Sequence, residues 1–108
     1  MTIADTIDKV DPDNISLVEG VLGYNILVRS EHAGSIEGYP GRIEYITVEL
    51  PWEGKGVARA AVNEFIKLSR NEGVSKVTTN NAMHPAMEHI LETEGFNEQS
   101  DGWEREVR

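Results

Sequence analysis

The sequence contains no cysteine, which excludes disulfide bonds, thiolate-ligated metal sites and a cysteine nucleophile. No apolar run approaches the roughly 20 residues that a membrane-spanning helix needs. The first ten residues are acidic and lack the positively charged start of a secretory signal. We therefore expect a cytoplasmic protein of 108 residues that contacts no membrane, and we predict no metal site.

Positive charge is also scarce, because ten basic residues stand against 19 acidic ones and the net charge is −9. We expect no nucleic-acid partner, since phosphate backbones are bound by clustered lysine and arginine. A cationic molecule, such as an amine, a polyamine or a basic protein tail, would be attracted instead. The alternative interpretation is that the charge serves solubility or adaptation to high salt.

An acidic N-terminal segment, residues 1–14, precedes a single domain at 15–108. The segment predicts either a short helix from Ile3 to Val10 or a loose tail. The β-rich stretches 15–19, 24–29 and 42–48 predict strands. The glycine-rich stretch 30–41 predicts a hairpin loop or flap, with a possible short strand at 35–39.

Two helices follow in the second half of the chain. Apolar residues recur every three or four positions from 56 to 71, which predicts a long amphipathic helix. A strand is expected at 74–79, then a loop at 80–83, and a second helix that starts at His84-Pro85 and ends at Gly95. A hairpin of 96–98 and 103–107 closes the chain. The predicted fold class is α/β, with the order β-β-β-α-β-α-β-β.

A glycine-lined turn, Glu53-Gly54-Lys55-Gly56-Val57-Ala58, joins the strand at 42–48 to the long helix. Free N–H groups at a helix start bind anions, and glycine lets a phosphate approach the backbone. The turn is not a Walker loop, because no hydroxyl residue follows Lys55. It is not a dinucleotide fingerprint, because Arg59 stands where the third glycine would be. The remaining alternatives are another phosphate site or a plain tight turn.

The turn resembles the pyrophosphate loop of the GNAT superfamily of acetyl-CoA-dependent N-acetyltransferases, written Gln/Arg-x-x-Gly-x-Gly/Ala. The stretch 41–48 before the turn and Gly95-Phe96 after it also look like GNAT elements, so the resemblance covers roughly the last two-thirds of the chain. It implies a GNAT-like mixed sheet with helices on both faces. GNAT proteins usually have two helices between their first two strands. This sequence is too short there to contain them.

The resemblance also implies acetyl-CoA as co-substrate. The expected cofactor-binding residues are the main-chain amides of the turn and the strand before it, together with the side chains of the first helical turn: Ile46, Thr47, Val48, Glu53, Gly54, Lys55, Gly56, Val57, Ala58 and Arg59. Glu53 stands where the family has Gln or Arg, and its carboxylate repels a pyrophosphate. Either Lys55 or Arg59 offsets that charge, or Glu53 points into solvent.

Glu44 is the candidate catalytic residue, since some GNAT enzymes carry a general base at this place. Strand alternation puts it on one face with Ile46 and Val48, which predicts partial burial and a raised pKa. The alternative is an exposed glutamate paired with Arg42 or Arg29. The tyrosine that acts as general acid in many GNAT enzymes is Leu91 here, and His84 and His89 are either substitutes for it or structural residues.

These observations predict an N-acetyltransferase that moves an acetyl group from acetyl-CoA to a primary amine of a small molecule or protein. The alternative is a non-catalytic acyl-CoA-binding domain with a regulatory or assembly role. A homodimer could complete so short a domain.

Overall fold

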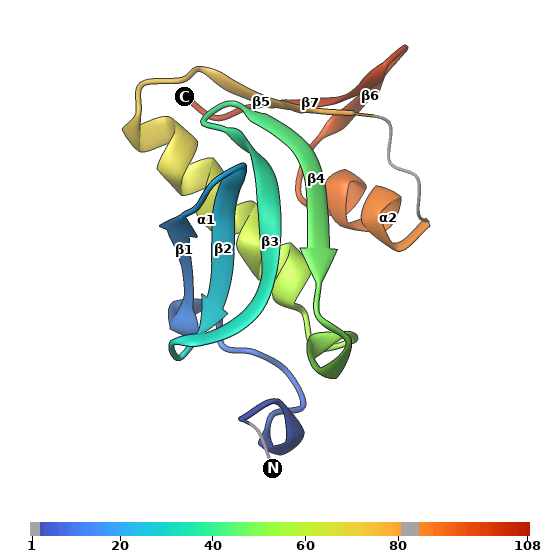
Figure 1. Ribbon diagram of the computed structural model, residues 1–108. Coiled ribbons are helices and arrows are strands. Elements are labelled where there is room, and N and C mark those ends of the chain that lie inside the picture. Colours follow the sequence, from blue (N-terminus) through green and yellow to red (C-terminus); the bar gives the residue numbers. More distant parts are fainter. Residues whose placement is uncertain (1–2, 81–84) are drawn as a thin grey trace.

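One sheet of seven strands organises the protein in a computed structural model that describes residues 3–80 and 85–108 (Figure 1). The strand order across the sheet is β1-β2-β3-β4-β5-β7-β6. In chain order the elements are the 3-10 helices η1 (Ile3–Thr6) and η2 (Pro12–Asn14), β1 (Ile15–Glu19), β2 (Gly23–Val28), β3 (Glu31–Tyr39), β4 (Arg42–Val48), the 3-10 helix η3 (Leu50–Trp52), α1 (Val57–Asn71), β5 (Lys76–Thr79), α2 (Pro85–Thr93), β6 (Asn97–Gln99) and β7 (Gly102–Glu106).

The sheet is mixed. Strands β1 to β4 form an antiparallel meander, and β5, β7 and β6 pair antiparallel at the other end. The two parts meet through a parallel pairing of β4 with β5, which α1 connects. This pairing joins only Arg42 with Thr78 and Ile43 with Thr79. The rest of β4 therefore runs away from β5.

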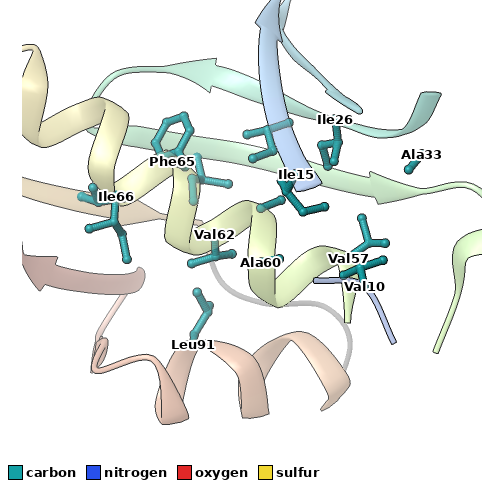
Figure 2. Close-up of a cluster of buried hydrophobic side chains, with 14 of the residues drawn as sticks. Val10, Ile15, Ile26, Ala33, Val57, Ala60, Val62, Phe65, Ile66 and Leu91 are labelled. Carbon is teal, nitrogen blue, oxygen red and sulfur yellow. The ribbon is translucent and has the colours of Figure 1, made fainter. Parts of the chain in front are cut away.

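Helix α1 forms because its apolar residues follow the helical period and bury one stripe against the sheet. In Figure 1 it crosses behind β1 to β4. Phe65 is fully buried, and its ring meets the ring of Tyr24 edge-on, with centroids 5.9 Å apart. On the other side of α1, Val62 points toward Leu91 of α2 (Figure 2). Trp52 and Trp103 are also buried, so both cover the core.

The predicted α/β class and mixed sheet are confirmed, but the structure has one strand more than the predicted order. The stretch 30–41, predicted as a hairpin loop or flap with a possible short strand at 35–39, contains the nine-residue strand β3 (31–39) between β2 and β4. The glycines that suggested a loop serve close strand contact instead. A Cβ added at Gly34 would lie 2.1 Å from the Thr47 carbonyl oxygen. Arg29 and Ser30, with φ of 50° and 73°, make the tight turn into β3.

Two further details differ from the expectation. The helices do not lie on both faces of the sheet, because α1 and α2 lie side by side (Figure 2). Arg59 of α1 donates a hydrogen bond to Thr93 of α2. The face of β1 to β4 away from α1 is exposed at Asn25, Tyr45 and Thr47. The N-terminal segment forms the two short helices η1 and η2 rather than one helix from Ile3 to Val10.

The chain passes from β1 to β2 through residues 20–22 alone, so the first two strands have no helices between them, as expected. Of the predicted loop at 80–83 only Asn80 belongs to the described residues, and His84 lies outside them. Neither helix in the described ranges has the length and apolarity that a membrane crossing requires.

Candidate functional site

The turn from β4 into α1 is held in place by a buried anchor. Trp52 of η3 is 2% exposed, and the chain then turns through Gly54 and Gly56, with φ of 75° and 84°. Both angles lie in the left-handed region, where residues other than glycine are strained. The backbone conformation, rather than the space around it, therefore requires glycine at these two positions.

The N–H groups of this turn are free. The first hydrogen bond of α1 is donated by Ala60 to the Gly56 carbonyl, at 3.1 Å. Within the described parts of the chain, the N–H groups of residues 54 to 59 donate no hydrogen bond. Six consecutive free donors at the start of a helix, together with the positive end of its dipole, favour an anion.

The two basic side chains near these amides, those of Lys55 and Arg59, are bound by other segments. The Lys55 ammonium donates to the Ile7 carbonyl at 2.6 Å. The Arg59 guanidinium binds the Glu94 carboxylate at 2.5 Å and the Thr93 hydroxyl at 2.6 Å, so it ties α1 to the end of α2. The expectation that Lys55 or Arg59 offsets Glu53 is therefore wrong for this arrangement. Glu53 is exposed to solvent, which was the alternative.

Beside the turn, β4 presents a free edge. The Glu49 N–H donates to the Ala33 carbonyl of β3 at 2.8 Å. Because the polar groups of a strand alternate between its two edges, those of Thr47 also face β3, and those of Ile46 and Val48 face the other edge. In the described chain no strand pairs with that edge beyond Ile43. Of the three predicted contacts on β4, Ile46 and Val48 are thus available to a ligand, whereas Thr47 is engaged with β3.

A β-bulge moves Glu44 out of the position predicted for it. The register between β3 and β4 shifts between Glu37 and Gly38, so that Glu37 pairs with Tyr45 and Gly38 with Ile43. Glu44 is the extra residue, and a bulge reverses the alternation on its far side. Ile43 is consequently buried while Glu44 is exposed, so the expected partial burial beside Ile46 and Val48 is wrong.

Glu44 is held by two neighbours at the point where β4 and β5 separate. The Asn80 amide donates to Glu44 Oε2 at 2.9 Å, and Arg42 Nε donates to Oε1 at 3.2 Å. Both hydrogen bonds hold the pKa of the Glu44 carboxyl below its ordinary value, and the bond from Asn80 has the larger effect. The positive charge of Arg42 lowers this pKa further. The direction is opposite to the predicted one, because Glu44 is exposed and accepts hydrogen bonds from Asn80 and Arg42. The pairing with Arg42 was the alternative expectation.

Arg42 and Asn80 also bind each other, and Arg42 Nη1 donates to the Thr78 hydroxyl at 3.2 Å. No motif in the sequence singles out Asn80. A usable signal was its position, since it is the polar residue directly after a strand that runs parallel to β4. Polar groups at the carboxyl ends of parallel strands gather at ligand sites.

The residues considered as general acid lie elsewhere. Leu91 is 2% exposed and faces α1 (Figure 2), so it belongs to the core. His89 is exposed on α2. Two shallow hollows of the surface lie away from the turn: one of about 350 Å³ beside the β1–β2 connection, and one of about 160 Å³ beside β5 and β7.

No protein-family model matches the sequence, and no curated protein matches it. Solved structures of N-acetyltransferases do match the fold. Ard1 from Thermoplasma volcanium superposes with a TM-score of 0.68 at 16% identity, over 90% of this chain and 72% of its own. The putative N-acetyltransferase YhhK from E. coli, solved bound to coenzyme A, gives a TM-score of 0.61 at 21% identity, over 90% of this chain and 74% of its own.

PaiA N-acetyltransferase from Thermoplasma acidophilum, solved in complex with coenzyme A, superposes with a TM-score of 0.59 at 11% identity. It covers 77% of this chain and 58% of its own. Identities this low establish a shared fold, and activity is a separate question. The chain has the fold of the GNAT N-acetyltransferases.

Proposed function

We propose that the protein binds acetyl-CoA and transfers its acetyl group to a primary amine. One observation carries this proposal: the free N–H groups of residues 54–59 lie directly after a strand whose edge is open at Ile46 and Val48. A diphosphate joined to a long amide-containing arm needs both features together. Two structures with this fold, those of YhhK and PaiA, are described as complexes with coenzyme A.

The turn has room for such a ligand. A Cβ built at Gly54 would meet nothing within 4 Å, and one built at Gly56 would meet only the Lys9 side chain, at 3.9 Å. The amides of residues 54–58 would therefore bind the diphosphate, as the sequence predicts. The main chain of Ile46 and Val48 would pair with the amides of the pantetheine arm like an added strand.

Acetyl-CoA would supply an acyl group on a sulfur leaving group. In the transfer the neutral amine nitrogen forms a bond to the acyl carbon, the carbon–sulfur bond breaks with its electron pair going to the CoA thiolate, and the nitrogen loses one proton. An acceptor that arrives as an ammonium ion loses one further proton before it attacks. Glu44 is the candidate to accept that proton, directly or through a water molecule, because it lies where β4 leaves β5. Its carboxyl is ionised at neutral pH, since its pKa is below the ordinary value.

The acceptor would be a cationic amine on a small molecule or a protein. The chain carries a net charge of −9, which attracts a positive acceptor and repels an acidic one. The three-residue connection between β1 and β2 leaves the face of β1 to β4 uncovered by helices. A bulky acceptor can therefore approach without a structured pocket around it.

A second candidate function is acyl-CoA binding without catalysis. Leu91 in the core offers no proton to a leaving thiolate, and the ion pair with Arg42 weakens Glu44 as a base. The two functions are separated by calorimetry with acetyl-CoA, combined with release of free thiol against a panel of primary amines. Binding with thiol release supports the transferase. Binding without release for every amine favours the second function, and absence of binding refutes both.

A further inference from the structure

The N-terminal segment lies against the glycine turn. The Val10 N–H donates to the Lys55 carbonyl at 2.9 Å, and the Lys55 ammonium donates to the Ile7 carbonyl at 2.6 Å. Ala4 is 1% exposed and Val10 belongs to the same buried cluster as Val57 (Figure 2). The N-terminal segment is thus attached to Lys55 at two points, Ile7 and Val10.

Lys9 lies between these two points of attachment in the chain. Its Cδ atom lies 3.9 Å from the position that a Cβ would take at Gly56, and its ammonium is two bonds further along the side chain. Lys9 is exposed and, among the described residues, its side chain makes no hydrogen bond or ion pair. Its charge is therefore available beside the free amides of the turn.

Neither basic side chain of the turn is free to meet a diphosphate bound there. Glu53 carries the same sign as the ligand, and Lys55 and Arg59 are held by Ile7 and Glu94. We propose that Lys9 makes the charged contact to the diphosphate of acetyl-CoA, so that the N-terminal segment is part of the ligand site. This inference rests on the proposed function. It adds a residue that no pattern in the turn indicates.

The test is calorimetry with coenzyme A on the full chain and on Lys9→Met, which keeps the aliphatic stem and removes the charge. We expect affinity to fall by roughly 5- to 20-fold, the size of one charge-assisted hydrogen bond. Lys9→Arg should restore most of it. The matched control is Lys67→Met, which removes the same charge from an exposed position on α1 and should change affinity less than twofold.

The loss for Lys9→Met should shrink as salt is raised from 0.05 to about 0.5 M, because screening weakens a contact between exposed charges. If the full chain binds coenzyme A and Lys9→Met binds it equally well, the role of Lys9 is refuted while the proposed function stands. If Lys67→Met weakens binding as much as Lys9→Met, the effect is net charge and the specific contact is likewise refuted. If the full chain does not bind coenzyme A, the proposed function fails and this inference fails with it.

Discussion

One amide group of Asn80 binds Glu44 twice, through the carboxylate at 2.9 Å and through the main-chain carbonyl at 3.1 Å. The last paired residues of the two parallel strands are Ile43 and Thr79. The next carbonyl of β4 is thus taken by a side chain rather than by a further residue of β5. This contact marks the place where the strands separate and the free edge of β4 begins.

Removing the Asn80 amide should raise the pKa of Glu44. Asn80 is the largest cause of the lowered value, so Asn80→Ala moves the pKa upward, though still below the ordinary value because Arg42 remains. The measurement is an NMR titration of the Glu44 side-chain carboxyl carbon in both proteins. Asn25→Ala, an exposed asparagine on β2, is the control and should leave the titration where it is. An unchanged titration in Asn80→Ala would show that this hydrogen bond does not form in solution.

Replacing Glu44 with glutamine tests its role as a base. If Glu44 accepts the proton of the amine, Glu44→Gln should lower turnover by about 10²-fold, because glutamine accepts no proton at neutral pH. Acetyl-CoA affinity should stay within twofold, since the side chain lies outside the glycine turn. Thiol release and calorimetry measure the two quantities. The control is Glu37→Gln, a carboxylate on the neighbouring strand, and equal turnover in both variants would remove Glu44 from the mechanism.

Gly56 and Gly73 offer a matched pair, because both have φ of 84° and stand at opposite ends of α1. A side chain at either position costs roughly 1–2 kcal/mol in backbone strain. Gly56→Glu also places bulk and negative charge among the free amides, so it alone should abolish binding of acetyl-CoA. Thermal unfolding and calorimetry on Gly56→Glu and Gly73→Glu check the two effects. The turn would lose its assigned role if Gly56→Glu bound acetyl-CoA as well as Gly73→Glu does.

Arg59 is expected to serve the packing of the helices rather than the ligand. Its guanidinium binds Thr93 and Glu94, so Arg59→Met should lower the free energy of unfolding by about 1 kcal/mol. Acetyl-CoA affinity should change by less than threefold. Chemical denaturation and calorimetry give the two numbers. Contradiction would come from a tenfold loss of affinity at unchanged stability, which would mean that Arg59 turns toward the ligand.

Local patterns in the sequence predict most of the architecture. Interactions between residues close together in the chain determine several elements, so periodicity and turn chemistry predict them. These elements are the apolar stripe on α1, the glycine turn before it and the strands at 15–19 and 42–48. Strand β3 was predicted only in part, as a possible short strand at 35–39, because Gly34 and Gly38 resemble loop residues. Both glycines let the backbone of β3 approach β4 closely, Gly34 at Thr47 and Gly38 at Arg42, and this contact across the strands leaves no local pattern in the sequence.

The candidate site was predicted in outline but not in its charges. A bulge of one residue decides which way Glu44 points, and no alternation rule reveals a bulge in advance. Lys55 and Arg59 bind Ile7 and Glu94, which lie 48 and 35 residues away in the sequence. Such pairings depend on the tertiary fold, so a motif read along the chain assigns these side chains to the wrong partner.

The most direct test of the account is an amide NMR titration with coenzyme A. We predict that the largest shifts fall on the free N–H groups of residues 54–59 and on the open edge of β4 at Ile46 and Val48, with Thr47 less affected. Shifts confined to other surfaces, such as the hollow beside the β1–β2 connection, or no shifts at millimolar ligand, would contradict it.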